Sequence, residues 1–162
     1  MNEAQVTIDT LLGEHAAIRA HVNIVRGLTR DWKTLLDRRD SILTSPDELR
    51  ATDEKRSNLR QAMAYLDDGL KKHHVHEDSI FPLLIGEMLL EAIKMEHNEI
   101  LKFLEKVNYR IINDNITDFL KEGAEVMRMI DEVCGLSAAH ASREDGILYF
   151  LKKLPVSPKA AV

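Results

Sequence analysis

Four long segments of the chain carry apolar residues at alternating steps of three and four positions. They span residues 7–36, 46–81, 87–111 and 117–151, with the start of the third placed within 83–87. This spacing puts an apolar stripe along one face of an α-helix. Four such helices with mostly short connections favour an antiparallel up-down-up-down bundle. We therefore predict an all-α four-helix bundle over residues 1–154, followed by a flexible C-terminal tail over 155–162.

Two breaks in this pattern set the ends of the second helix. Residues 37–45 do not continue the apolar spacing and are predicted to form a loop. Pro82 disfavours helical backbone at Phe81, so the second helix is expected to end or kink there. The stripe of this helix contains Thr52 and Arg56 near its start. That end of the helix is therefore expected to be less buried than the rest.

Two short motifs each occur twice and alternate along the chain. Glu14-His15-x-x-Ile18 returns as Glu96-His97-x-x-Ile100, and His73-x-x-x-Glu77-Asp78 returns as His140-x-x-x-Glu144-Asp145. A histidine and a carboxylate four positions apart lie one above the other on a helix, so the pair can hold one metal ion from one side. The alternation predicts a tandem repeat of a two-helix unit, with histidine and glutamate side chains meeting between the helices.

Six of these polar residues fall on the apolar stripes of the four predicted helices. They are His15, His73, Glu77, His97, His140 and Glu144. At about 1.5 Å per residue, the four histidines lie roughly 12–20 Å from helix ends that an antiparallel bundle brings together. The six side chains are therefore expected at one level of the core. The adjacent residues, His74 among them, are about 100° further around each helix and fall off the stripe.

Two carboxylates buried in an apolar core without partners would be costly and would tend to protonate, and metal cations remove that cost. Imidazole suits iron, zinc, copper and nickel. Six donors exceed what one tetrahedral zinc ion uses, and the repeat suggests two equivalent ions. Four histidines and two bridging glutamates, with an oxo or hydroxo bridge, would leave one position open on each six-coordinate ion. Open positions permit binding of O₂, NO or peroxide.

These residues, with Ile80-Phe81-Pro82 after the second motif, resemble the hemerythrin-like HHE cation-binding domain over roughly residues 7–152. The resemblance implies a four-helix bundle holding a non-haem di-iron centre bridged by the two glutamates. It also implies family roles in O₂ carriage, O₂ or redox sensing, iron handling, and responses to NO or iron–sulfur damage. One departure is Leu101, where oxygen-carrying members place a further histidine. Without that histidine both irons would stay open, which argues against simple O₂ storage.

The other titratable residues have less specific patterns. His21, His74 and His76 are expected to face solvent, although His74, His76 or Asp145 remains a possible substitute ligand. Asp78 and Asp145 are expected to stand behind the ligands or on the surface. Glu14 and Glu96 each precede a histidine of an apolar stripe and point about 100° away from it, so they are expected on the solvated faces of their helices. Cys134 is expected in the core, with a redox role left open.

Three functions are compatible with this sequence. The first is a di-iron protein, without catalysis, that binds O₂ or a related small molecule as a sensor, buffer or scavenger. The second is a di-iron enzyme that reduces peroxide or NO, or that serves iron-dependent repair of damaged iron centres. The third is a metal-free or zinc-bound module acting through protein contacts, for which the polar stripe at Thr52 and Arg56 is the best feature.

The composition of the chain limits the partners and the cellular compartment that we expect. A net charge of -5 and scattered Lys and Arg give no support for a nucleic-acid partner. No basic and apolar leader opens the chain, and its apolar runs are too short for a membrane span. The single cysteine excludes an intramolecular disulfide and favours a reducing compartment. We therefore expect a cytoplasmic protein with a small-molecule partner and no membrane contact.

Overall fold

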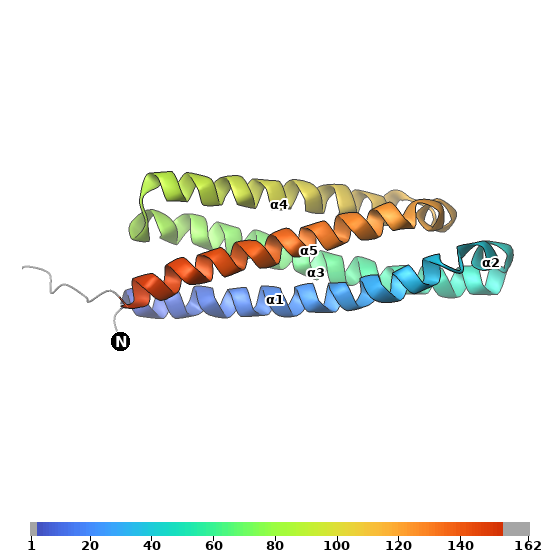
Figure 1. The fold of residues 1–162 in the computed structure, drawn as a ribbon, viewed down its shortest axis with the longest axis horizontal. Coiled ribbons are helices and arrows are strands. Elements are labelled where there is room, and N and C mark those ends of the chain that lie inside the picture. The colour runs from blue at the N-terminus through green and yellow to red at the C-terminus, as the bar shows by residue number, and fades with distance from the viewer. Residues whose placement is uncertain (1–2, 154–162) are drawn as a thin grey trace, which may run out of the picture.

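Residues 3–153 form five helices in the computed structural model, and they confirm the predicted all-α class. The helices are α1 (Glu3–Leu36), α2 (Arg39–Thr44), α3 (Pro46–Leu84), α4 (Glu87–Asn113) and α5 (Ile116–Lys153). α1, α3, α4 and α5 form the body of an elongated bundle (Figure 1). The predicted tail over residues 155–162 lies outside the described residues.

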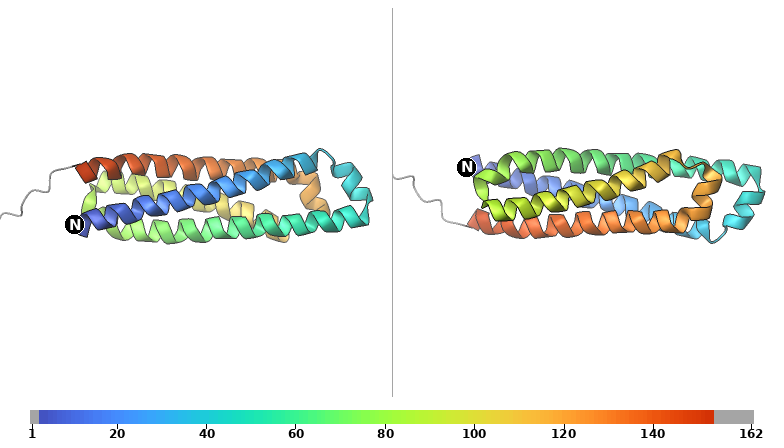
Figure 2. Two further views of the ribbon diagram at one scale, coloured as in Figure 1. Left: turned by 90° about the horizontal axis from the view of Figure 1, so that it is seen from below. Right: turned by 90° about the horizontal axis from the view of Figure 1, so that it is seen from above.

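The four long helices alternate in direction. α1 packs against α3 and α5, and α4 packs against the same two helices from the other side. The starts of α1 and α4 therefore lie at the same end of the bundle as the finishes of α3 and α5, as the two views of Figure 2 show. This antiparallel order brings the repeated motifs to one level of the bundle, although they are far apart in the sequence.

The predicted loop over residues 37–45 and an end of the second helix at Phe81 are both wrong. Within the expected loop, residues 39–44 form the short helix α2, which buries Ile42 against the end of the bundle. Helix α3 continues through Pro82 to Leu84, because the proline sits in the last turn and removes only one backbone hydrogen bond there. The Ile85 N–H then donates to the Phe81 carbonyl at 2.9 Å and closes the helix.

The start of α3 and the start of α5 are both capped by side chains. Ser45 accepts a hydrogen bond from the Glu48 N–H at 3.4 Å, and Pro46 occupies the first helical position. Asn115 accepts from the Asp118 N–H at 2.9 Å. These caps fix where each helix begins, and so they fix the height at which its histidine meets the others.

The start of α3 is mostly exposed, as its polar stripe predicts, but two polar positions of that stripe are buried. Thr52 and Arg56 are 3% and 8% exposed. Arg56 donates to the Asp114 carbonyl at the end of α4, pairs with Asp53 at 2.8 Å, and places its guanidinium 5.6 Å from the Phe119 ring centre. Because these contacts compensate the buried charge, the two residues offer no protein-binding surface, and the third function loses its best feature.

Two apolar clusters fill the bundle on either side of the motif level. The smaller cluster, near the ends of α3 and α5, contains Ile8, Leu11, Phe81, Leu90, Ile93 and Leu148. The larger one occupies the other half, where Trp32 meets Phe119 edge to face at 5.0 Å. Each fully buried large apolar side chain contributes about 1.5–3 kcal/mol. Among the described residues no helix combines the length and the apolarity that crossing a membrane requires.

Substitution of two glycines of α5 by alanine is expected to change the stability of the protein in opposite directions. A Cβ at Gly135 meets nothing within 4 Å, so Gly135→Ala should raise the free energy of unfolding by roughly 0.5–1 kcal/mol through helix propensity. A Cβ at Gly123 would lie 2.5 Å from Leu36 Cδ2, and overpacking costs about 1–3 kcal/mol. In urea unfolding, Gly123→Ala should be the less stable variant by about 1 kcal/mol. The gap should close in a Leu36→Ala background; equal gains in the unmodified background would contradict the packing.

Cys134 lies in the larger apolar cluster with no exposed surface. Burial raises the pKa of its thiol to about 11, so very little reactive thiolate forms at pH 8. We expect iodoacetamide to leave Cys134 unmodified in the native protein at pH 8 and to alkylate it fully in denaturant, as read by mass spectrometry. Labelling at equal rates in both states would show that the thiol is accessible, and would reopen a redox role.

Candidate metal centre

Glu77 lies at the centre of the motif level, projecting from α3, and its side chain has no exposed surface. Its Oε1 atom lies 3.2 Å from His15 Nε2 and 3.1 Å from His73 Nε2. Its Oε2 atom lies 3.1 Å from His97 Nε2. The two oxygens of this carboxylate therefore face histidines from different helices.

Glu144 occupies the equivalent position on α5 and is 1% exposed. Its Oε2 atom lies 3.2 Å from His15 Nε2 and 3.1 Å from His140 Nε2, and its Oε1 atom lies 3.8 Å from His97 Nε2. Like Glu77, it turns one oxygen toward His15 and the other toward His97. Two carboxylates arranged in this way can bridge two ions, one on each side.

The structure thus brings together all six side chains that the sequence predicts at one level. Their ligand atoms form two groups in which every atom lies within 4.8 Å of the others. The groups are His15, His73, Glu77 and Glu144, and Glu77, His97, His140 and Glu144. The two groups share both glutamates. Their role as metal ligands stays a prediction.

Several of these buried atoms have no hydrogen-bond partner within the described chain. They are Nε2 of His73, His97 and His140, Oε2 of Glu77, and both carboxylate oxygens of Glu144. The short distances above are therefore close approaches without hydrogen-bond geometry for most of the pairs. Orphaned buried polar atoms are rare and costly. Nitrogen and carboxylate donors that converge without saturating one another fit a pair of transition-metal cations.

Protons compensate the two buried carboxylates in the metal-free chain. Burial alone would lower the pKa of His15, but Glu144, Glu77 and Asp145 outweigh it and raise that pKa to about 10. For His97, Glu144 and Glu77 likewise overcome burial and raise the pKa to about 9. Burial would raise the pKa of Glu77, yet the nearby imidazoles of His15, His73 and His97 hold that pKa well below its ordinary value. Because metal ligation needs neutral imidazole, an ion would displace these protons.

Glu14 and Glu96 support two of the histidines from behind. Glu14 Oε2 lies 2.8 Å from His73 Nδ1, and Glu96 Oε2 lies 2.8 Å from His140 Nδ1. The expectation of solvated faces is therefore wrong, because each glutamate reaches sideways to a histidine of a neighbouring helix. These hydrogen bonds place Nδ1 outward and leave Nε2 for the centre, as in histidines that hold metals. The repeated Glu-His dipeptide was the signal in the sequence.

Asp145 and Asp78 occupy equivalent places behind the other two histidines. Asp145 lies 2.6 Å from His15 Nδ1 and 2.8 Å from Arg19, and its side chain is 18% exposed. Asp78 lies 3.7 Å from His97 Nδ1 and is 45% exposed. Asp145 therefore contacts the outer nitrogen of a histidine and does not point its carboxylate into the centre as a substitute ligand.

His74 is buried beside the centre and does not face solvent, so the prediction for this residue is wrong. It is 3% exposed, and its ring stacks on the His97 ring at 3.8 Å with planes 6° apart. It also belongs to a cluster of potential ligands with His97 and His140. Burial lowers the pKa of His74 to about 2, so its ring is neutral. Its place next to His73 was the only signal, since two adjacent positions can both lie on a wide buried face.

The remaining histidines lie outside the centre. His76 is partly exposed, and its Nδ1 lies 2.8 Å from Glu14 Oε1. His21 bonds to the Ala17 carbonyl of its own helix at 3.0 Å. Neither side chain reaches Glu77 or Glu144 within the contacts of the described residues, so neither acts as a substitute ligand in this conformation.

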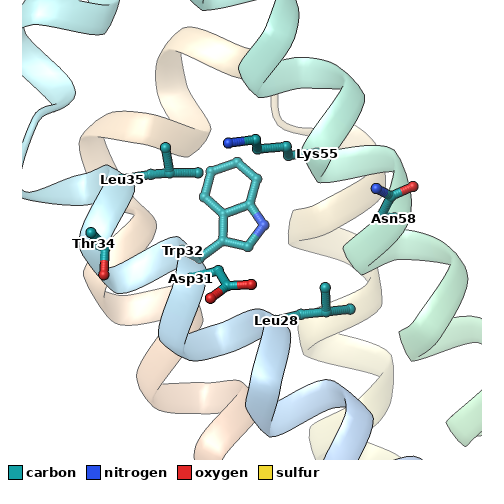
Figure 3. A pocket seen from close by; sticks show the side chains of 7 residues that line it. All are labelled: Leu28, Asp31, Trp32, Thr34, Leu35, Lys55 and Asn58. Carbon is teal, nitrogen blue, oxygen red and sulfur yellow. The ribbon is translucent and has the colours of Figure 1, made fainter.

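One surface groove approaches the centre. It has a volume of about 390 Å³, lies between α3 and α4, and is lined in part by His74, His97 and Leu101. A second hollow, between α1 and α3, is shown in Figure 3. Trp32 stands at the middle of that hollow, roughly 25 Å along α1 from His15. Of these two hollows, the groove between α3 and α4 therefore offers a route to the histidines of the centre.

A comparison with protein families agrees with this geometry. The sequence model of the hemerythrin HHE cation binding domain matches residues 6–151. No curated protein and no solved structure matches the chain at a significant level. The match covers nearly all of the bundle, including both repeats and every residue of the two ligand groups. The chain therefore belongs to the hemerythrin HHE cation-binding domain family.

Proposed function

We propose that the centre holds two iron ions joined by an oxo or hydroxo bridge, and that the protein binds O₂, NO or peroxide as a sensor, buffer or scavenger. The observation that carries this proposal is the orientation of Glu77 and Glu144. Each turns one oxygen toward His15 and the other toward His97. A single ion would not need two carboxylates shared between two sets of histidines.

The residues divide into two sets around the shared glutamates. His15 and His73 would hold one ion, and His97 and His140 would hold the other. Iron supplies the redox change and the open coordination position that binding of a diatomic molecule requires. The chain fixes the histidines through Glu14, Glu96 and Asp145. The apolar clusters above and below close off the centre along the bundle axis.

The single cysteine of the chain favours a reducing compartment for this protein. Cys134 is a buried free cysteine, and it is the one cysteine of the chain. A reducing cytoplasm suits such a protein. A reducing compartment would also return an oxidised iron pair to its ferrous state, which a sensor or scavenger needs after each encounter with an oxidant.

Metal content and absorption test this function directly. Iron-loaded protein should hold about two irons per chain, with charge-transfer bands that appear in air and disappear on reduction. The His15→Ala variant should lose most of this iron. The His21→Ala variant should retain it, because His21 lies six residues further along α1 and outside the centre. A spectrum that is the same in reduced and air-exposed protein would count against the proposal. Steady-state turnover of peroxide or NO would assign the centre to an enzyme.

The two aspartates give a matched test of how the chain supports its ligands. Asp145→Asn should lower metal affinity by about 10–100-fold, as removal of a histidine's outer partner does in other metal sites. Asp78→Asn should change affinity far less, because Asp78 lies 3.7 Å from His97 and is largely solvated. Competition with a chromophoric chelator measures the metal affinity of both variants. Equal losses in the two variants would show that the hydrogen bond to His15 has no special role.

A further inference from the structure

The two metal positions have unequal numbers of donors within reach. The first group offers two histidines and the two glutamates, and so does the second. His74, however, clusters with His97 and His140 and not with His15 and His73. The His97 side of the centre therefore has one more buried imidazole than the His15 side.

No hydrogen bond in the described chain compensates the burial of the His74 ring nitrogens. Neither of its ring nitrogens has a hydrogen-bond partner there. The other four histidines of the centre each have a carboxylate near Nδ1, whereas His74 has none. Its ring contacts are to other histidines, with His140 at 5.7 Å between ring centres. Two unpaired polar atoms in a buried place are costly, so a ligand for His74 is needed.

In its stacked orientation, the His74 ring cannot bind the same ion as His97. An ion bound by imidazole lies close to the plane of the ring, and two parallel rings do not share such a position. His74 must therefore turn about its Cβ–Cγ bond before it and His97 can bind the same ion. That torsion is soft in histidine. The groove between α3 and α4, which His74 lines, leaves space for the turn.

We propose that His74 is a fifth histidine of the centre, which leaves its stack on His97 and binds the ion held by His97 and His140. This inference rests on the proposed pair of ions. Three histidines, two glutamates and the bridge then complete six donors at that ion. The ion at His15 and His73 keeps one position open. A small molecule accordingly binds on the His15 side, and the departure at Leu101 does not leave both ions open.

A histidine exchange across the groove tests this assignment. Leu101 lies one helical turn after His97 and lines the same groove as His74, so a histidine at position 101 reaches the same ion. The variants are His74→Leu, the double variant His74→Leu with Leu101→His, and His21→Leu as the control. Each is loaded with ⁵⁷Fe, checked for helicity by circular dichroism, and compared with the unmodified chain by iron content, chelator competition and Mössbauer spectroscopy.

The expected result is two irons per unmodified chain with two distinct quadrupole doublets. His74→Leu should bind its second iron at least about tenfold more weakly, and Leu101→His should restore both the affinity and the pair of doublets. A folded His74→Leu variant with unchanged affinity and spectrum would overturn the role of His74 while the di-iron function stands.

If the His74→Leu variant does not fold, the Mössbauer spectrum of the unmodified chain still tests the assignment of His74. Two irons in equivalent environments, seen as one doublet, would overturn the assignment of His74 and leave the iron pair intact. An unmodified chain that takes up no pair of irons would overturn the proposed function and the role of His74 together.

Discussion

The structure depends on two carboxylates that are held without solvent in the middle of a helical bundle. Glu77 and Glu144 have almost no exposed surface, and each of their four oxygens lies close to an imidazole nitrogen. Removing one partner from a buried ion pair costs about 3–5 kcal/mol, so the histidines around them form one unit. Protons on His15 and His97 balance this charge in the metal-free chain, and cations of higher charge would balance it better. Stability and metal binding are thus properties of the same contacts.

The bundle makes this concentration of charge possible because its helices are antiparallel. Each repeat supplies one Glu-His helix and one His-x-x-x-Glu helix, and the antiparallel order brings the four to the same height. Apolar clusters on both sides of the centre add to the stability of the bundle. The outer nitrogens of the histidines then find carboxylates from neighbouring helices, with Glu14 serving His73 and Glu96 serving His140. The near two-fold arrangement of the centre is a direct result of the repeat.

The sequence was sufficient for the four long helices and for the six converging side chains, because helical spacing and length determine which residues share a face and a level. It was insufficient for His74, since a rotation of about 100° is smaller than the width of a deeply buried face. Glu14 and Glu96 were missed because their contacts lie between helices, where the reach of a long side chain decides. Arg56 was missed because its burial depends on a carbonyl at the end of α4, which no pattern within α3 reveals.

The central claim is that Glu77 and Glu144 bridge two iron ions, and anomalous diffraction tests it most directly. Crystals of iron-loaded protein, measured above and below the iron absorption edge, would locate every iron from its own signal. We expect two anomalous peaks between the glutamates, one beside His15 and His73 and one beside His97 and His140. A single peak, or peaks away from these carboxylates, would contradict it.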